Sequence, residues 1–138
     1  MKKLLINIWS LIKNYLFKKP KRRKLSKGEA FVKAWLDMNN ISYVAQYHIT
    51  VPRSIRPSGN CYVDFLVTKN KKKFAIEYND RQHYEFVPRF HKSREDFNNQ
   101  LVRDEYIKSW CNKKDITFIE IPYTWKTDQI IDNLKEML

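Results

Sequence analysis

Polar and apolar positions recur with helical spacing near the start of the chain. In residues 3–17, polar side chains follow one another every three or four positions, and apolar side chains fill the opposite stripe. This spacing predicts an amphipathic helix. Residues 18–24 follow as a basic linker that Pro20 interrupts. We therefore expect residues 1–25 to form an amphipathic helix and basic linker, followed by one domain over residues 26–138.

The domain is predicted to open with a helix at Ser26. Ser26 and Glu29 have the spacing of a capping box, in which each side chain bonds the other residue's main-chain N–H. That structural role alone would account for Glu29. We expect the helix to end near residue 40, and its predicted buried stripe is Phe31, Ala34, Trp35 and Met38.

The rest of the chain alternates between strand and helix patterns. β-Branched and aromatic residues are enriched in four short segments, while helical periodicity follows two polar helix starts. The predicted strands are residues 41–51, 61–68, 73–78 and 116–122, and the predicted helices are residues 93–112 and 127–138. The domain is therefore predicted to be α/β, with the element order α-β-β-β-α-β-α.

Charge is concentrated at one end of the chain. The net charge is +12, and residues 1–27 hold ten Lys or Arg and no acid. A basic segment suits nucleic acid or an anionic membrane surface, although it could serve only for solubility. Residues 4–17 are too short and too polar to span a bilayer, which needs about 20 apolar residues. Without a signal-peptide pattern, we expect a soluble intracellular protein.

The central hairpin supplies the first candidate site. A loop centred between Asn70 and Lys71 pairs residues whose numbers sum to 141, so Asp64 should face Glu77. Opposed carboxylates repel each other, and the surrounding sequence is apolar. A divalent cation would compensate, because Mg²⁺ takes one or two carboxylates together with phosphate oxygens and water. The alternative is that one acid pairs with Lys or Arg on a solvated face.

The segment after the second hairpin strand is polar and ends in a histidine. In Glu77-Tyr78-Asn79-Asp80-Arg81-Gln82-His83, the chain leaves the strand near the proposed metal. His83 is a candidate general acid or base near neutral pH. Gln82 or Arg81 could orient the phosphate. His48 is expected to be structural, and His91 has no evident partner.

These residues resemble the PD-(D/E)XK nuclease superfamily, in its very-short-patch-repair and homing-type branch. The resemblance covers about residues 26–123 and implies a restriction-endonuclease-like core. It implies a catalytic acid at Glu29, a metal ligand at Asp64 and a catalytic histidine at His83. It also makes Asp104 and Lys108 candidates for the acid and base found on the next helix of such enzymes.

Two departures from the family pattern affect the expected activity. Asn79 and Asp80 stand where relatives have Asp-Gly, and Asn79 also occupies the place of the superfamily's lysine. Gln82 or His83 would have to replace that lysine, or catalysis is reduced or lost.

The sequence therefore predicts a metal-dependent DNA endonuclease of homing or repair type that uses Mg²⁺ or Mn²⁺. RNA is an open alternative substrate. The competing hypothesis is an inactive nuclease-fold protein that binds nucleic acid, or docks in a larger assembly through its N-terminal helix. That helix could also lie on a membrane surface. The predicted phosphate contacts are Lys18, Lys19, Lys21, Arg22, Arg23, Lys24, Arg53, Arg56 and Arg81.

Overall fold

The computed structural model describes residues 23–138. The predicted helix over residues 3–17 and the basic residues 18–22 lie outside this part, so the division of the chain at residue 25 stays a prediction. The elements are α2 (Lys27–Met38), β1 (Tyr43–Thr50), β2 (Asn60–Lys69), β3 (Lys72–Asn79), a 3-10 helix η1 (Arg81–His83), α3 (Arg94–Lys113), β4 (Thr117–Pro122) and α4 (Thr127–Met137). Apart from the short η1, this is the predicted element order.

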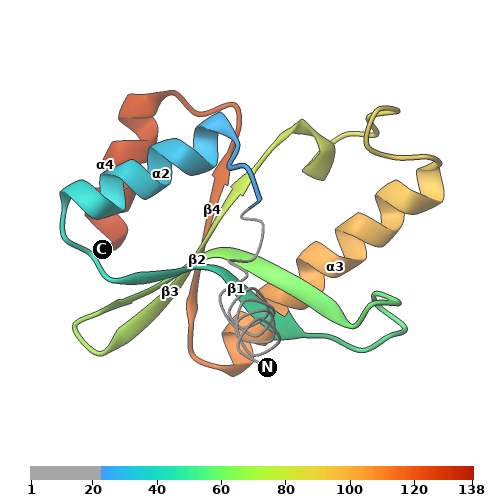
Figure 1. The fold of residues 1–138 in the computed structure, drawn as a ribbon, viewed down its shortest axis with the longest axis horizontal. Helices are drawn as coiled ribbons and strands as arrows, with labels where there is room; N and C mark the ends of the chain where they lie inside the picture. Colours follow the sequence, from blue (N-terminus) through green and yellow to red (C-terminus); the bar gives the residue numbers. More distant parts are fainter. Residues whose placement is uncertain (1–22) are drawn as a thin grey trace, which may run out of the picture.

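The four strands form one mixed sheet in the order β1-β2-β3-β4. β1 and β3 are antiparallel to β2, and β4 is parallel to β3. The parallel pair requires a crossover, and α3 supplies it. Helices α2 and α4 cover one face of the sheet, while α3 covers the other (Figure 1). The predicted α/β class is therefore confirmed at the level of a mixed sheet between helices.

The hairpin between β2 and β3 has the predicted register. Thr68 pairs with Lys73 and Phe65 pairs with Ile76. The two turn residues, Asn70 and Lys71, have φ angles of 53° and 64°. Two consecutive positive φ angles are what a two-residue type I′ turn requires, and this turn matches the twist of the strands. The turn chemistry thus fixes which residues oppose each other along the hairpin.

Helix α2 begins as predicted but presents a different face to the sheet. Ser26 Oγ accepts the main-chain N–H of Glu29, and the Glu29 side chain accepts the N–H of Ser26, which confirms the capping box. The fully buried residues are Val32 and Leu36, whereas Met38 is 83% exposed. The predicted stripe was wrong for Ala34 and Met38, which are both exposed, because the helix is rotated about its axis so that its acidic first turn is buried; Phe31 and Trp35 are partly buried against the core.

Each face of the sheet has its own hydrophobic core. The core beneath α2 and α4 contains Val32, Leu36, Phe65, Val67, Phe74, Ile76, Ile119, Ile121, Ile130 and Leu134. The core beneath α3 contains Ile49, Val51, Cys61, Val63, Leu66, Ala75, Ile107, Cys111 and Ile116.

Within residues 23–138, no helix combines the length and the apolar character needed to cross a bilayer.

Candidate active site

The candidate site lies where the sheet divides. The pairing of β2 with β3 stops at Phe65 and Ile76, so the next opposed residues, Asp64 and Glu77, are not part of the ladder. Beyond this point the first half of β2 continues with β1, whereas β3 continues with β4. The two halves diverge in Figure 1, with α3 beside them. The predicted metal ligands therefore stand at the junction of the two halves.

Strand β2 rotates at Asp64. Val63 belongs to the core beneath α3, but Phe65, two positions later, belongs to the opposite core. In a regular strand both would lie on one face. The β1–β2 ladder also omits Asp64 and Gln46, and Gln46 has a φ of 51°, a conformation that non-glycine residues adopt uncommonly. This irregularity frees Asp64 from the ladder.

The carboxylates of Asp64 and Glu77 bond the main chain of each other's strand. Asp64 Oδ2 accepts the N–H of Tyr78 (2.9 Å), and Glu77 Oε1 accepts the N–H of Asp64 (3.3 Å). Gln46 Nε2 adds a long hydrogen bond to Asp64 Oδ1 (3.3 Å). These few bonds are modest compensation for two acidic groups, of which Asp64 is only 7% exposed.

Burial, and then the charge of neighbouring carboxylates, raises the pKa of both groups. Burial raises the pKa of Asp64 to about 7, and the Glu29 carboxylate adds to the shift. The pKa of Glu77 lies well above its usual range, because it is buried and faces Asp64. The pKa of Asp80 is also raised, by burial and then by Glu29. A site whose carboxyl groups bind protons more tightly than exposed carboxyl groups do would also be stabilised by a bound cation.

Glu29 reaches the same site from the start of α2. It is 5% exposed, and its Oε1 lies 2.5 Å from Arg23 Nη2. The same Arg23 nitrogen is 3.9 Å from Asp64 Oδ1. Gly28 permits this approach, because a Cβ at that position would overlap the ring of Tyr78. Glu29 therefore completes a capping box and also lies beside the acidic group, while its catalytic role stays a prediction.

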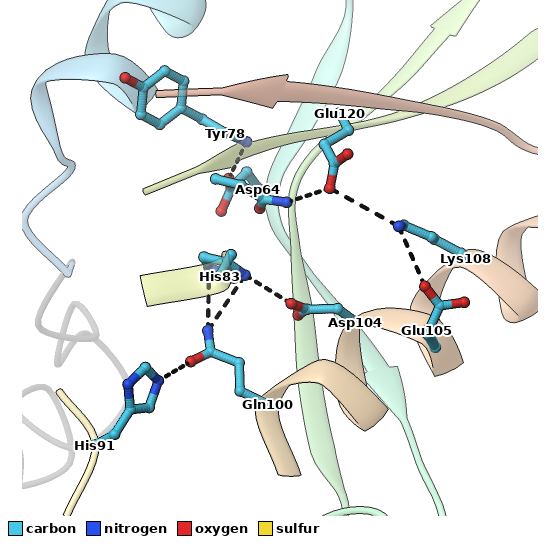
Figure 2. A network of polar contacts seen from close by, with 10 residues as sticks. Asp64, Tyr78, His83, His91, Gln100, Asp104, Glu105, Lys108 and Glu120 are labelled. Atoms are coloured by element: carbon cyan, nitrogen blue, oxygen red, sulfur yellow. Dashed lines mark hydrogen bonds and ion pairs between the residues drawn. The ribbon is translucent and has the colours of Figure 1, made fainter. Parts of the chain in front are cut away.

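His83 is held by residues of α3. Its Nδ1 lies 2.9 Å from Asp104 Oδ2, and Gln100 Nε2 lies 3.3 Å from each of its ring nitrogens. Gln100 Oε1 is in turn 2.7 Å from Nε2 of His91 (Figure 2). The side chains of His83 and Asp104 are 21% and 23% exposed, so solvent reaches the pair. The structure thus brings together two residues that the sequence proposed separately.

Asn79, which stands where the PD-(D/E)XK pattern would have a lysine, is a buried amide. Asn79 is 4% exposed, and its Nδ2 donates to Glu120 Oε1 (2.8 Å). Lys108 Nζ lies 4.0 Å from that same Glu120 oxygen. Glu77, Asp104 and Lys108 all line one small cavity between β3 and α3. A lysine is therefore present near Glu77, on a helix instead of the strand.

The remaining candidates are dispersed. The Gln82 side chain makes no hydrogen bond within residues 23–138, and Arg81 pairs with Glu85 (2.7 Å). Arg53 and Arg56 lie exposed in the β1–β2 loop, and Lys24 is exposed before α2. The structure does not gather these cations around the acids, with the exception of Arg23.

The side chains that could hold a metal are few. Within the described part of the chain, no three His, Cys, Asp or Glu side chains are arranged to hold one ion. Asp64 and Glu77 are a two-carboxylate set, and Mg²⁺ commonly uses such a set with water and phosphate oxygens. Glu77 suits this role, because its carboxylate receives one long hydrogen bond within residues 23–138.

Sequence reasoning overlooked Gln100, His91 and Gln46. A signal existed for Gln100, because Gln100, Asp104 and Lys108 are four residues apart and share one helix face. Nothing local distinguishes Gln46, whose partner Asp64 lies in β2, and the side-chain partner of His91 is Gln100 in α3.

Comparisons with known proteins identify viral relatives. No family model matches the chain, and no solved structure gives a significant match. The chain is 45% identical over 69 residues to the uncharacterized protein 307L of Invertebrate iridescent virus 6, a match covering 50% of this chain and 35% of that protein. It is 53% identical over 68 residues to the uncharacterized protein 094L of Frog virus 3, covering 49% and 40% respectively. The chain thus spans well under half the length of these relatives.

Proposed function

We propose that the protein is a metal-dependent endonuclease with a restriction-endonuclease-like core, as the resemblance to the PD-(D/E)XK superfamily implies. Its reaction would be hydrolysis of phosphodiester bonds in DNA. The observation that carries the proposal is the His83–Asp104 pair, 2.9 Å apart, of which Asp104 shares a small cavity with the half-buried Glu77, next to the buried Asp64. A proton-transfer group next to a cation-demanding acid pair is what metal-assisted hydrolysis needs.

Each residue has a distinct role in this proposal. Asp64 and Glu77 would hold Mg²⁺ or Mn²⁺, which when bound supplies Lewis acidity and neutralises charge at the phosphate. His83 would accept a proton from the attacking water. Asp104 would orient the imidazole by accepting the hydrogen bond of its Nδ1–H. Glu29 would add negative charge beside Asp64 and so favour the cation.

The direct test is cleavage of plasmid DNA in the presence of Mg²⁺ or Mn²⁺. We expect Asp64→Asn and Glu77→Gln each to reduce the rate at least 100-fold, because a metal ligand is lost. Asp132→Asn is the matched control, since it removes an exposed carboxylate from α4 and should retain the wild-type rate. A wild-type protein without cleavage on any DNA or RNA would contradict the proposal.

A nucleic-acid-binding protein without catalysis is the second candidate. The observation that favours it is Asn79, which occupies the place of the superfamily lysine and is committed to Glu120. In this alternative the basic N-terminal residues bind nucleic acid or a larger assembly. Divalent-metal titration separates the candidates, because an inactive binder should bind DNA equally well with Mg²⁺ and with a chelator.

A further inference from the structure

His91 is a buried histidine whose protonation is dictated by its neighbours. It is 4% exposed, and its ring lies between Phe86 and Phe97, at centroid distances of 5.8 and 5.3 Å. The main-chain N–H of Val87 donates to His91 Nδ1 (3.0 Å). A main-chain amide can only donate, so Nδ1 must present a lone pair. The proton of the neutral ring is therefore on Nε2.

This proton fixes the orientation of the Gln100 amide. His91 Nε2 donates to Gln100 Oε1 (2.7 Å), which leaves the NH₂ group facing His83. An amide nitrogen also only donates. Because this NH₂ group lies 3.3 Å from both ring nitrogens of His83, at least one of those nitrogens must be unprotonated.

Asp104 decides which of the two ring nitrogens carries the proton. An ionised carboxylate only accepts, so the 2.9 Å contact with Asp104 Oδ2 places a proton on His83 Nδ1. Nε2 is then the nitrogen that accepts from Gln100. Asp104 thus specifies the tautomer of His83, with Nδ1 protonated, and the Gln100 amide donates to the lone pair that this tautomer leaves on Nε2.

We propose that Gln100 and His91 are positioning residues that present an NH₂ donor to His83, so that Nε2 keeps its lone pair and can accept a proton. The inference deepens the proposed function and rests on it for its catalytic consequence. The direction of the hydrogen bonds starts from the main chain of Val87, which cannot reverse. The contact of Gln100 with Nε2 is long, at 3.3 Å, so it orients the ring and costs little to break when Nε2 takes a proton.

The tautomer can be read directly from imidazole ¹⁵N NMR of the full-length protein, without any activity. We expect the wild type to carry a proton on Nδ1 and none on Nε2, and Asp104→Ala to give a mixture of both tautomers, because Gln100 contacts both nitrogens equally. In Gln100→Leu we expect the ¹⁵N resonance of Nε2 to move toward that of an imidazole nitrogen that accepts no hydrogen bond, because the donor is lost. Asn99→Leu is the control, because it removes an exposed amide from the adjacent position of α3.

A reversal of polarity gives the second test. In Gln100→Glu the new carboxylate can only accept, so we expect His83 to carry a proton on Nε2, where the wild type has none. Cleavage by this variant should show kcat lowered about tenfold or more, part of the ~10²–10⁴ that base catalysis contributes, with KM for DNA unchanged. NMR spectra of His83 that are indifferent to both Gln100 substitutions would overturn the inference. A wild-type protein that does not cleave, but shows these NMR changes, would overturn the proposed function alone.

Discussion

Arg23 Nη2 lies 2.5 Å from Glu29 Oε1. A basic residue that precedes α2 by four positions is therefore paired with a buried acid. The same guanidinium is 3.9 Å from Asp64 and lowers the pKa of that carboxyl against the larger effect of burial. Arg23 thus supplies part of the positive charge that a metal ion would supply. It is 59% exposed, so solvent screens this interaction.

We predict that Arg23→Gln strengthens Mn²⁺ binding in the absence of DNA by about threefold to tenfold, on the order of 1 kcal/mol for a partly screened charge. The reason is that the substitution removes a cation, the Arg23 guanidinium, that competes with Mn²⁺ for Glu29 and Asp64. Calorimetric titration with Mn²⁺ measures the change. Lys24→Gln removes the same charge one position later and should have a smaller effect. Equal effects of the two substitutions would mean that only net charge matters.

The raised pKa of Asp64 predicts that stability depends on pH. The folded protein binds this proton more tightly than the unfolded chain, so the stabilisation is present below pH 3.8 and is lost as pH rises to about 7. We expect the free energy of unfolding of Asp64→Asn to rise relative to that of the wild type by roughly 2–4 kcal/mol between pH 4 and pH 8, which corresponds to about 10 °C in Tm. Thermal unfolding of both proteins with a chelator measures this difference.

Millimolar Mg²⁺ distinguishes a metal site from a merely strained acid pair. At pH 8 it should raise the Tm of the wild type, because the ion binds the folded state, and leave Asp64→Asn nearly unchanged. A parallel shift in both proteins would count against Asp64 as a ligand.

Local rules were sufficient for the parts of the fold that they govern. The opposition of Phe65 to Ile76 follows from a two-residue turn and the period of a strand, and the start of α2 follows from its capping box. The exposure of Met38 did not follow, because the rotation of α2 depends on how it packs against Tyr78 and the sheet.

In the site, too, contacts within one hairpin could be predicted from the sequence and contacts between distant elements could not. Asp64 and Glu77 could be placed opposite each other from sequence, since both belong to one hairpin. The contact between His83 and Asp104 joins η1 to α3, and only the packing of α3 beside the divided sheet determines it. The rotation of β2 at Asp64 likewise depends on Gln46 in another strand.

We predict that His83→Ala lowers the cleavage rate about 10²–10⁴-fold and leaves DNA affinity nearly unchanged, because the imidazole acts mainly in the transition state. Single-turnover cleavage and a binding titration with Ca²⁺ in place of Mg²⁺ measure the two quantities. His48→Ala is the control, since it removes an exposed histidine that contacts Asn60. If Gln82→Ala loses cleavage and His83→Ala does not, Gln82 holds the catalytic role.

The final prediction concerns which basic residues bind DNA. One group is Lys18, Lys19, Lys21 and Arg22, which precedes Arg23; another is Lys71, Lys72, Lys73 and Lys114, which gathers around the β2–β3 turn at the strand ends remote from Asp64. Each group carries four charges, so the two can be replaced by glutamine in matched variants. We predict that the N-terminal variant binds DNA more weakly.

The salt dependence of binding then measures how many phosphates each group neutralises. For duplex DNA the slope of log K against log salt is about −0.9 for each phosphate contact, so loss of four contacts should reduce its magnitude by about 3 to 4. We expect this change in the N-terminal variant and a slope close to wild type for the turn variant. The reverse result would mean that DNA binds at the β2–β3 turn. DNA bound there would lie remote from Asp64 and Glu77 and would not present a phosphate to them. Such an outcome would separate the basic segment from the candidate site and favour a different partner for it.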